Sequence, residues 1–456
     1  MVYQLILTNM TCRNLSLKDN CYWGKEIAIY SETDKNLLHT LSSPVNELVK
    51  EKDLLVFPHS FSLGDGESSI LSYSEASNRV YTNNMMGFVG SNGFNIRIHS
   101  SFDNNDSDFF LHYMLMRISG INLFDLATGY SPTNNIYDLL IFLFPSFLND
   151  AMSVGLMKMY VEHEYNDDHV RGMLDIQRHI KKNKPNNGRV AYKVREYSFD
   201  NPINELIRHC IEYIKLTSIG RKLLNANAQI RNNVSKIIEI TPTFKLGEKF
   251  KIIQKNHKTI VHPLYKKYTK LQKLCLAILQ HKKIAYDYND NKIHGIVFDG
   301  AWLWEEYLAV VLRNKMKHCT RNTKSYYLFD NNRQRIIPDF LSLQAGNNIV
   351  GDAKYIHLDK FAKGEIREEA RAEAIYYKTI MYMLRFNSHT GYLFYPLSKE
   401  NNEPPEQNFT VLENDAINKR HLFLVGLKIT NSSSDFRAFC NGMKEEENNF
   451  LARLCE

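Results

Sequence analysis

The sequence predicts an α+β protein in three parts. A β-rich N-terminal domain is expected over residues 1–130, a mainly helical middle region over 131–290, and an α/β domain over 291–456. Three observations support this division. The 456 residues are too many for one ordinary domain. The hydrophobic content of 44% is sufficient for globular cores. The spacing of apolar residues changes from short runs between polar turns to helical spacing, and then to alternating helices and strands.

The composition narrows the class of protein. The net charge of +7, from 57 Lys+Arg against 50 Asp+Glu, suits a nucleic-acid enzyme but not a histone-like protein. The seven cysteines form no CxxC pair, which argues against a disulfide framework or a zinc site and favours a reducing compartment. The most apolar run, residues 139–148, is too short to span a bilayer, and the sequence opens with no basic leader. We therefore expect a cytoplasmic protein without membrane contact.

Short apolar runs between polar turns predict strands in the N-terminal part. The candidate strands are residues 3–7, 27–30, 53–57 and 94–98. Gly64-Asp65-Gly66 and Gly87-Phe88-Val89-Gly90 are expected to form tight turns. A phosphate loop at the first glycine stretch is disfavoured, because no Lys followed by Ser or Thr comes after it.

Apolar residues three and four positions apart predict helices from about residue 107 to about 288. Within residues 136–159, a strip of methionines (Met152, Met157 and Met159) is expected to pack in the core. A further helix is predicted to begin at Pro202, because proline is favoured in a first helical turn.

Residues 244–283 carry the densest positive charge of the chain. Two interpretations remain open: a solvated helix surface, or a face that contacts DNA phosphates without reading sequence. On the second interpretation the candidate contacts are Lys266, Lys267, Lys270 and Lys273.

The C-terminal part is predicted to alternate between helices and strands. A helix within residues 294–313, around Trp304, precedes strands over 336–343 and 348–355 that are joined by a hairpin turn at 345–347. The remaining expected elements are a helix over 362–386, strands over 391–396 and 421–427, and a polar loop over 399–407.

The most informative motifs are Pro338-Asp339 and Asp352-Ala353-Lys354. A hairpin between their strands would bring Asp339, Asp352 and Lys354 together. Two carboxylates can hold a hard divalent ion, and a lysine beside them can orient or deprotonate an attacking water, as phosphodiester cleavage requires. The alternative interpretation is that Asp339 is an ordinary turn residue after proline and that the Asp-x-Lys motif occurs by chance.

Glu305 is the candidate for a third acidic residue. On the helix around Trp304 it falls at the edge of the apolar arc, whereas Glu306 is expected on the opposite, polar face. A carboxylate at the rim of a buried face can point into a cleft, although an ordinary surface glutamate fits the same position.

The predicted order of elements in the C-terminal part is that of the PD-(D/E)xK, restriction-endonuclease-like core. This order is a helix, a strand with Asp, a strand with Asp-x-Lys, a helix and a strand. Several blocks of the sequence resemble the McrC family. They are VRGMLDI (170–176), REYSFDNPINELIRHCIEYI (195–214), LWEEYLAVVL (303–312), and PDF with DAKY. This family supplies the nuclease subunit of McrBC-type modification-dependent (type IV) restriction systems. The stretches GFVG, FNIRIHSSF and DFFLHYML resemble a region of its longer members, so that the resemblance covers about residues 85–400.

The resemblance implies roles for the matching positions. Asp339 and Asp352 would hold Mg²⁺, with Mn²⁺ as a possible substitute, Lys354 would act on the water, and Glu305 would be the helix acid. The family often has a Gln on the helix after the Lys. This chain lacks it, and Glu373 or Tyr377 is the candidate replacement.

The resemblance also implies partners: double-stranded DNA and an McrB-like AAA+ GTPase ring, whose GTPase the N-terminal part would stimulate by projecting into it. The sequence contains no GxxxxGK[ST] stretch, which agrees with this division of labour. Three alternatives remain: a non-catalytic DNA-binding scaffold, a stand-alone nuclease of the same fold, and a nuclease that reads unmodified sites.

Overall fold

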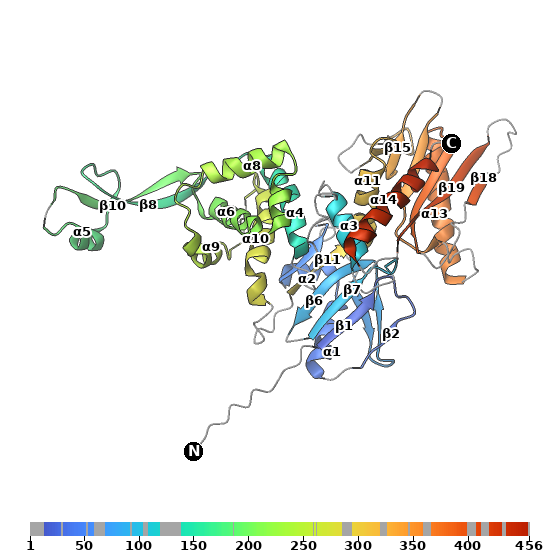
Figure 1. Cartoon of the computed structure of the whole chain (residues 1–456), viewed down its shortest axis with the longest axis horizontal. Helices are drawn as coiled ribbons and strands as arrows, with labels where there is room; N and C mark the ends of the chain where they lie inside the picture. Colours follow the sequence, from blue (N-terminus) through green and yellow to red (C-terminus); the bar gives the residue numbers. More distant parts are fainter. Residues whose placement is uncertain are drawn as a thin grey trace, which may run out of the picture. The chain divides into compact units, whose positions relative to one another are not determined.

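Figure 1 shows the computed structural model of the chain, which divides into two compact units. The structure describes residues 13–28, 31–51, 53–58, 69–91, 94–103, 108–118, 138–185, 187–258, 260, 262–284, 294–319, 326–344, 347–358, 366–398, 407–411, 419–430 and 435–454. The first unit takes its described residues from Met1–Ile118 and Asp287–Glu456, and the second from Tyr137–Tyr286. The strand predicted at 3–7 and the glycine turn at 64–66 lie outside the described residues. Within these ranges no helix is long and apolar enough to cross a membrane.

A five-stranded sheet with the order β1-β7-β6-β11-β3 lies in the first unit. Its strands are β1 (Arg13–Lys18), β3 (Asp53–Phe57), β6 (Met85–Ser91), β7 (Phe94–His99) and β11 (His294–Asp299). The strands β3 and β7 confirm the predictions at 53–57 and 94–98. Strand β11 is parallel to β3 and antiparallel to β6, and it occupies the first six residues of the window 294–313 in which a helix was predicted. Strand β11 comes from a much later part of the chain than the other four strands, but it completes the N-terminal sheet.

The tight turn predicted at Gly87-Phe88-Val89-Gly90 is wrong, because these residues lie inside β6. Gly87 has a φ of +140°, and a Cβ there would lie 2.1 Å from the backbone oxygen of Ile296. A glycine inside a strand often marks a close approach of another backbone, and here that backbone is β11.

The N-terminal part also contains elements that the sequence did not predict. They are the three-stranded sheet β2-β5-β4, from β2 (Lys25–Glu26), β4 (Leu71–Ser74) and β5 (Arg79–Thr82), and the helices α1 (Glu32–Leu41) and α2 (Val45–Glu51). Helix α3 (Phe109–Ile118) confirms the helical spacing predicted from about residue 107. Residues 27 and 28 of the strand predicted at 27–30 lie just after β2. Helix α1 follows Ser31, whose side chain accepts a hydrogen bond from the backbone of Asp34, as in other N-caps. The N-terminal part therefore contains helices beside its strands.

The second unit contains the predicted helices. They are α4 (Asp138–Met152), α6 (Pro202–Lys215), α7 (Ser218–Leu224), α8 (Ala228–Glu239), the 3₁₀ turn η2 (Leu246–Glu248), α9 (Lys249–Lys255) and α10 (Lys266–Ile284). Helix α6 begins at Pro202 as predicted, and Asn201 caps it by accepting from two backbone N–H groups. Met157 is buried, whereas Met152 and Met159 are half-buried.

A long hairpin that was not predicted lies in the same unit beside these helices. It consists of β8 (Met159–Asp167), β9 (Met173–Leu174), α5 (Ile176–Lys182) and β10 (Val190–Ser198). Figure 1 shows it extending away from the helices of this unit. Most positions of β8 and β10 are exposed or half-buried, so their sequences lack the apolar alternation by which strands are found.

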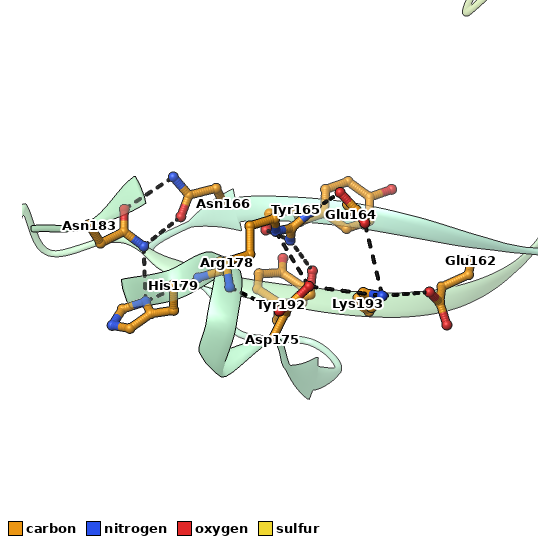
Figure 2. A network of polar contacts seen from close by, with 11 residues as sticks. Glu162, Glu164, Tyr165, Asn166, Asp175, Arg178, His179, Asn183, Tyr192 and Lys193 are labelled. Carbon is orange, nitrogen blue, oxygen red and sulfur yellow. Dashed lines mark hydrogen bonds and ion pairs between the residues drawn. The ribbon is translucent and has the colours of Figure 1, made fainter. Parts of the chain in front are cut away.

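Arg178 holds α5 against both long strands of this hairpin (Figure 2). Its Nη2 donates to the backbone oxygens of Tyr165 and Tyr192, at 2.6 and 2.8 Å, and its Nη1 donates to Glu164 at 2.5 Å. Lys193 on β10 adds an ion pair to Glu162 at 3.1 Å. These bonds fix the position of α5 at the hairpin although the surrounding surface is exposed.

A six-stranded sheet with the order β12-β15-β16-β17-β19-β18 forms the C-terminal part of the first unit. Its strands are β12 (Lys317–His318), β15 (Phe340–Ser342), β16 (Ile349–Ala353), β17 (Thr390–Leu397), β18 (Gln407–Val411) and β19 (Arg420–Lys428). The other elements are α11 (Gly300–Val311), α13 (Ile366–Arg385), α14 (Phe436–Ala452) and the pair β13 (Tyr326–Tyr327) and β14 (Arg335–Ile336).

Most of the predictions for this part are confirmed. The helix around Trp304 is α11, the helix over 362–386 is α13 where it is described, and the strands over 391–396 and 421–427 are β17 and β19. The strand predicted over 336–343 is interrupted at Pro338, which has no N–H to donate to a ladder. Neither α14 nor β18 was predicted, and residues 399–406 of the polar loop lie outside the described residues.

Candidate active site

Asp339 and Asp352 meet at one end of the β15–β16 hairpin. The two strands are antiparallel, with Phe340 opposite Gly351, so the residue before β15 lies beside the end of β16. The backbone N–H of Ala353 donates to Oδ2 of Asp339 at 2.7 Å. This bond ties the first aspartate to the residue between Asp352 and Lys354. The structure thus brings together three of the residues that the sequence singled out.

Two lysines face the carboxylate of Asp352, which is fully buried. Lys354 forms an ion pair with Oδ2, and Lys378 of α13 lies with its Nζ 3.4 Å from Oδ1. Lys354 leaves the sheet just after β16, where its backbone N–H donates to Phe394 of β17 at 2.8 Å. A buried carboxylate needs compensating charge, and here each oxygen has its own ammonium group.

The environment of this cluster shifts the pKa values of Asp339 and Asp352 in opposite directions. Burial and the neighbouring charge of Asp352 raise the pKa of Asp339 well above its ordinary value. Burial also acts to raise the pKa of Asp352, but the charges of Lys354 and Lys378 outweigh it, so this pKa lies below its ordinary value. Asp352 is therefore the fixed negative charge of the pair, and Asp339 is the carboxyl whose ionisation the protein opposes.

Glu305 lies on α11 and is held by His318 of β12. Its Oε1 is 2.8 Å from Nε2 of His318, and β12 pairs with the start of β15 directly after Asp339. The charge of Glu305 contributes to the raised pKa of Asp339. Burial lowers the pKa of His318, but the bond to Glu305 and the charges of Glu306 and Glu305 raise it above its ordinary value. Glu305 therefore faces the same corner of the sheet as the two aspartates.

Sequence reasoning missed Lys378 and His318. The candidates on α13, Glu373 and Tyr377, are both exposed, and it is the residue after Tyr377 that reaches Asp352. Glu306 is half-buried rather than set on a fully polar face. No local signal distinguishes Lys378 from other lysines, because the direction of its side chain depends on how α13 packs on the sheet.

The four lysines proposed as DNA contacts lie at the start of α10 in the second unit. Lys266, Lys267 and Lys270 are exposed and Lys273 is half-buried. The ammonium of Lys267 donates to Oγ of Ser153 at 3.0 Å. Their contact with DNA stays a prediction.

A polar contact joins the N-terminal sheet to the residue after Lys354. Tyr355 is buried, and its hydroxyl is 2.7 Å from Oγ of Ser100. Asp19, just after β1, accepts from the backbone N–H of Ser101 at 2.6 Å. The strand end that carries Lys354 is thus anchored in the N-terminal sheet.

Asp19→Asn is expected to stabilise the protein above pH 6. Burial raises the pKa of Asp19 from 3.8 to about 6, although the bonds from Ser101 act to lower it. Because the folded pKa lies above the unfolded one, the stability linked to Asp19 is fully present below pH 3.8 and is lost as pH rises through about 6. A shift of this size corresponds to about 3 kcal/mol at neutral pH.

Thermal unfolding at pH 8 and near pH 4 would measure this effect, with exposed Asp330→Asn as the control. We expect Asp19→Asn to raise the melting temperature at pH 8 and to change it little near pH 4. Equal shifts at the two pH values would contradict the assignment.

Comparison with known proteins provides a family match. A family model described as McrBC 5-methylcytosine restriction system component matches residues 80–396, which include Glu305, Asp339, Asp352 and Lys354. No curated protein matches the chain.

Among solved structures, the chain is similar to one in a refined half-complex from a tetradecameric assembly of Thermococcus gammatolerans McrB AAA+ hexamers with bound McrC. The identity is 16% and the TM-score 0.47, over 96% of this chain and 99% of that chain. A chain in the cryo-EM structure of the Thermococcus gammatolerans McrBC complex is similar at 17% identity and a TM-score of 0.29, over 66% of this chain and 87% of that chain.

Proposed function

Because this chain belongs to the family of McrBC 5-methylcytosine restriction system components, we propose that it is the DNA-cleaving subunit of such a complex. The observation that carries the proposal is the meeting of Asp339, Asp352 and Lys354 at one end of the β15–β16 hairpin. The order α11, β15, β16, α13, β17 is that of the PD-(D/E)xK core, and we assign the C-terminal part to this fold.

The two carboxylates fit a magnesium ion. Mg²⁺ is usually held by one or two carboxylates, with waters and substrate phosphates as its other ligands. Asp339 and Asp352 supply two such groups, and their mutual repulsion would be relieved by a cation between them. Mn²⁺ accepts the same oxygen ligands. When bound, the ion would offset phosphate charge and favour ionisation of the water.

Lys354 is suited to act on the attacking water. Its ammonium is held beside Oδ2 of Asp352 and also donates to the backbone oxygen of Ala353 at 3.2 Å. A water that binds there would face a fixed donor, which orients its lone pairs and stabilises developing negative charge. Glu305, held by His318, supplies the further carboxylate at the same corner.

We also propose an AAA+ GTPase ring as the partner. The chain contains no GxxxxGK[ST] stretch, so this route to nucleotide hydrolysis would need a second protein. The prediction placed the partner contact in the N-terminal part, and the β8–β10 hairpin provides a further candidate surface. Around α5 it exposes Met173 and Ile176, 75% and 67% accessible, next to Leu174. A group of exposed apolar side chains on an extended hairpin favours contact with another protein.

Replacing Met173 and Ile176 by serine should weaken association with the AAA+ ring at least about tenfold. Burying a side chain of this size contributes about 1.5–3 kcal/mol, and the double variant removes two of them. The affinity can be measured by binding of the purified ring to this protein immobilised on a surface. Leu216→Ser with Leu246→Ser is the control, because these leucines are also highly exposed but lie outside the hairpin. An equal loss in both pairs would contradict the docking role of the hairpin.

The function is tested by cleavage of long modified and unmodified DNA with Mg²⁺, by the chain with and without an McrB-like AAA+ protein, and with and without GTP. Cleavage in the complete mixture and in no other supports the proposal. Cleavage by the chain without the ring would favour a stand-alone nuclease. No cleavage under any condition would favour a non-catalytic DNA-binding scaffold.

A further inference from the structure

Lys378 is a second cation at the candidate active site, and it differs from Lys354 in its access to solvent. Its side chain is 42% exposed, whereas that of Lys354 is 19% exposed. Both ammonium groups face the same carboxylate, from different elements and at different oxygens. Lys354 lies deeper beside Asp352, and Lys378 is the lysine of the pair that a molecule arriving from solvent would meet more readily.

The backbone of Lys378 is positioned by the residue one turn later on α13. Tyr382 is buried and its hydroxyl donates to the backbone oxygen of Ile337 at 3.1 Å, two residues before Asp339. The ammonium of Lys378 lies 5.4 Å from the centre of the Tyr382 ring. The helix is therefore locked to the chain segment that carries Asp339, and the stem of Lys378 is guided along an aromatic face.

The charge balance explains why a second lysine would be useful there. Asp352 already has an ion pair with Lys354, and Lys378 adds a second ammonium group beside the same carboxylate. An extra positive charge beside Asp339 and Asp352 also opposes the binding of a divalent cation. Its presence is favourable if another anion occupies the site during the reaction, and a phosphodiester brings such an anion.

We propose that Lys378 contacts a non-bridging oxygen of the scissile phosphate and thereby acts as a substrate-binding, catalytic residue. This inference rests on the proposed nuclease function and extends it. A cation held by Asp352 would weaken the attraction between Asp352 and Lys378. The ammonium can then turn to the phosphate through rotation of its flexible stem, while Lys354 stays with the water.

The competing explanation is that Lys378 merely holds α13 against the sheet. The two roles differ in what restores function. A phosphate contact needs a positive charge at the end of the side chain, so arginine should restore part of it and methionine none. A contact that merely holds α13 against the sheet would be lost equally in the arginine and methionine variants, and its loss would lower the thermal stability.

The test compares Lys378→Met, Lys378→Arg and the control Arg385→Met in cleavage assays with the AAA+ ring, GTP and Mg²⁺ at several salt concentrations. Arg385 lies on the same helix, and its Nε bonds to the backbone of Tyr327 at 2.6 Å instead of facing Asp352. We expect Lys378→Met to lower kcat/KM at least about tenfold, which corresponds to about 1.4 kcal/mol. The slope of log rate against log salt should become shallower by about one phosphate contact. Lys378→Arg should restore part of the lost kcat/KM and part of the lost salt dependence. All three variants should keep the wild-type melting temperature.

Two results would overturn the inference. One is a Lys378→Met enzyme whose rate and salt slope match those of Arg385→Met. The other is an equal loss in Lys378→Met and Lys378→Arg together with a lower melting temperature, which would mean that Lys378 merely holds α13 against the sheet. Failure of the nuclease function itself would be recognised differently, because wild-type protein would then not cut DNA in the complete mixture, and the phosphate contact would fall with it.

Discussion

Replacing Asp352 by asparagine is expected to abolish DNA cleavage by the complete complex while the fold is retained. The change removes the fixed negative charge of the site, on which both metal binding and the position of Lys354 depend. Loss of one preorganised electrostatic group at an active site costs about 10²- to 10³-fold in rate, and a metal ligand should reach the upper end of this range. Asp339→Asn and Lys354→Met should show losses of the same kind.

The fold should survive because two effects of Asp352→Asn oppose one another. The lysines lose a charged partner, but the repulsion that raises the pKa of Asp339 disappears. Initial cleavage rates and melting temperatures of the variant should be compared with those of Asp330→Asn, which removes an exposed aspartate from the same unit. A cleavage rate within a few-fold of the control would sink the assignment of the active site.

The largest expected effect on stability comes from Glu447 of α14. This buried carboxylate accepts hydrogen bonds from the hydroxyls of Tyr113 and Tyr307, both at 2.8 Å, and binds Arg117 through two nitrogens at 2.7 and 3.1 Å. It joins α3, α11 and α14, and α11 also carries Glu305. Glu447→Ala should lower the free energy of unfolding by about 3–5 kcal/mol, because Arg117 and two hydroxyl groups lose their common acceptor inside the protein.

Urea unfolding followed by tryptophan fluorescence would measure this loss. All three tryptophans, Trp23, Trp302 and Trp304, lie in the first unit, so the signal reports on the unit that contains Glu447. Glu445→Ala, an exposed change on the same helix, should alter the free energy by no more than about 0.5 kcal/mol. Similar midpoints for the two variants would show that the buried cluster contributes little.

The elements of the C-terminal part were predictable because their signals are local. The periodicity around Trp304, the apolar runs of β17 and β19 and the turn residues between β15 and β16 all lie within short windows of sequence. The same method failed at the β8–β10 hairpin, whose two exposed faces leave no alternation, and at Gly87, where a glycine permits close strand packing rather than a turn.

The residue types of the candidate site and their close spacing are visible in the amino-acid sequence alone. Asp339, Asp352 and Lys354 lie within sixteen residues of one another on a single hairpin, so their meeting follows from local pairing. The tertiary structure decided which further groups join them: Lys378 from α13 and His318 beside Glu305. It also decided that β11 completes the N-terminal sheet. These contacts depend on how helices and distant strands pack together, and the free energy of that packing is not written in the periodicity of any one segment.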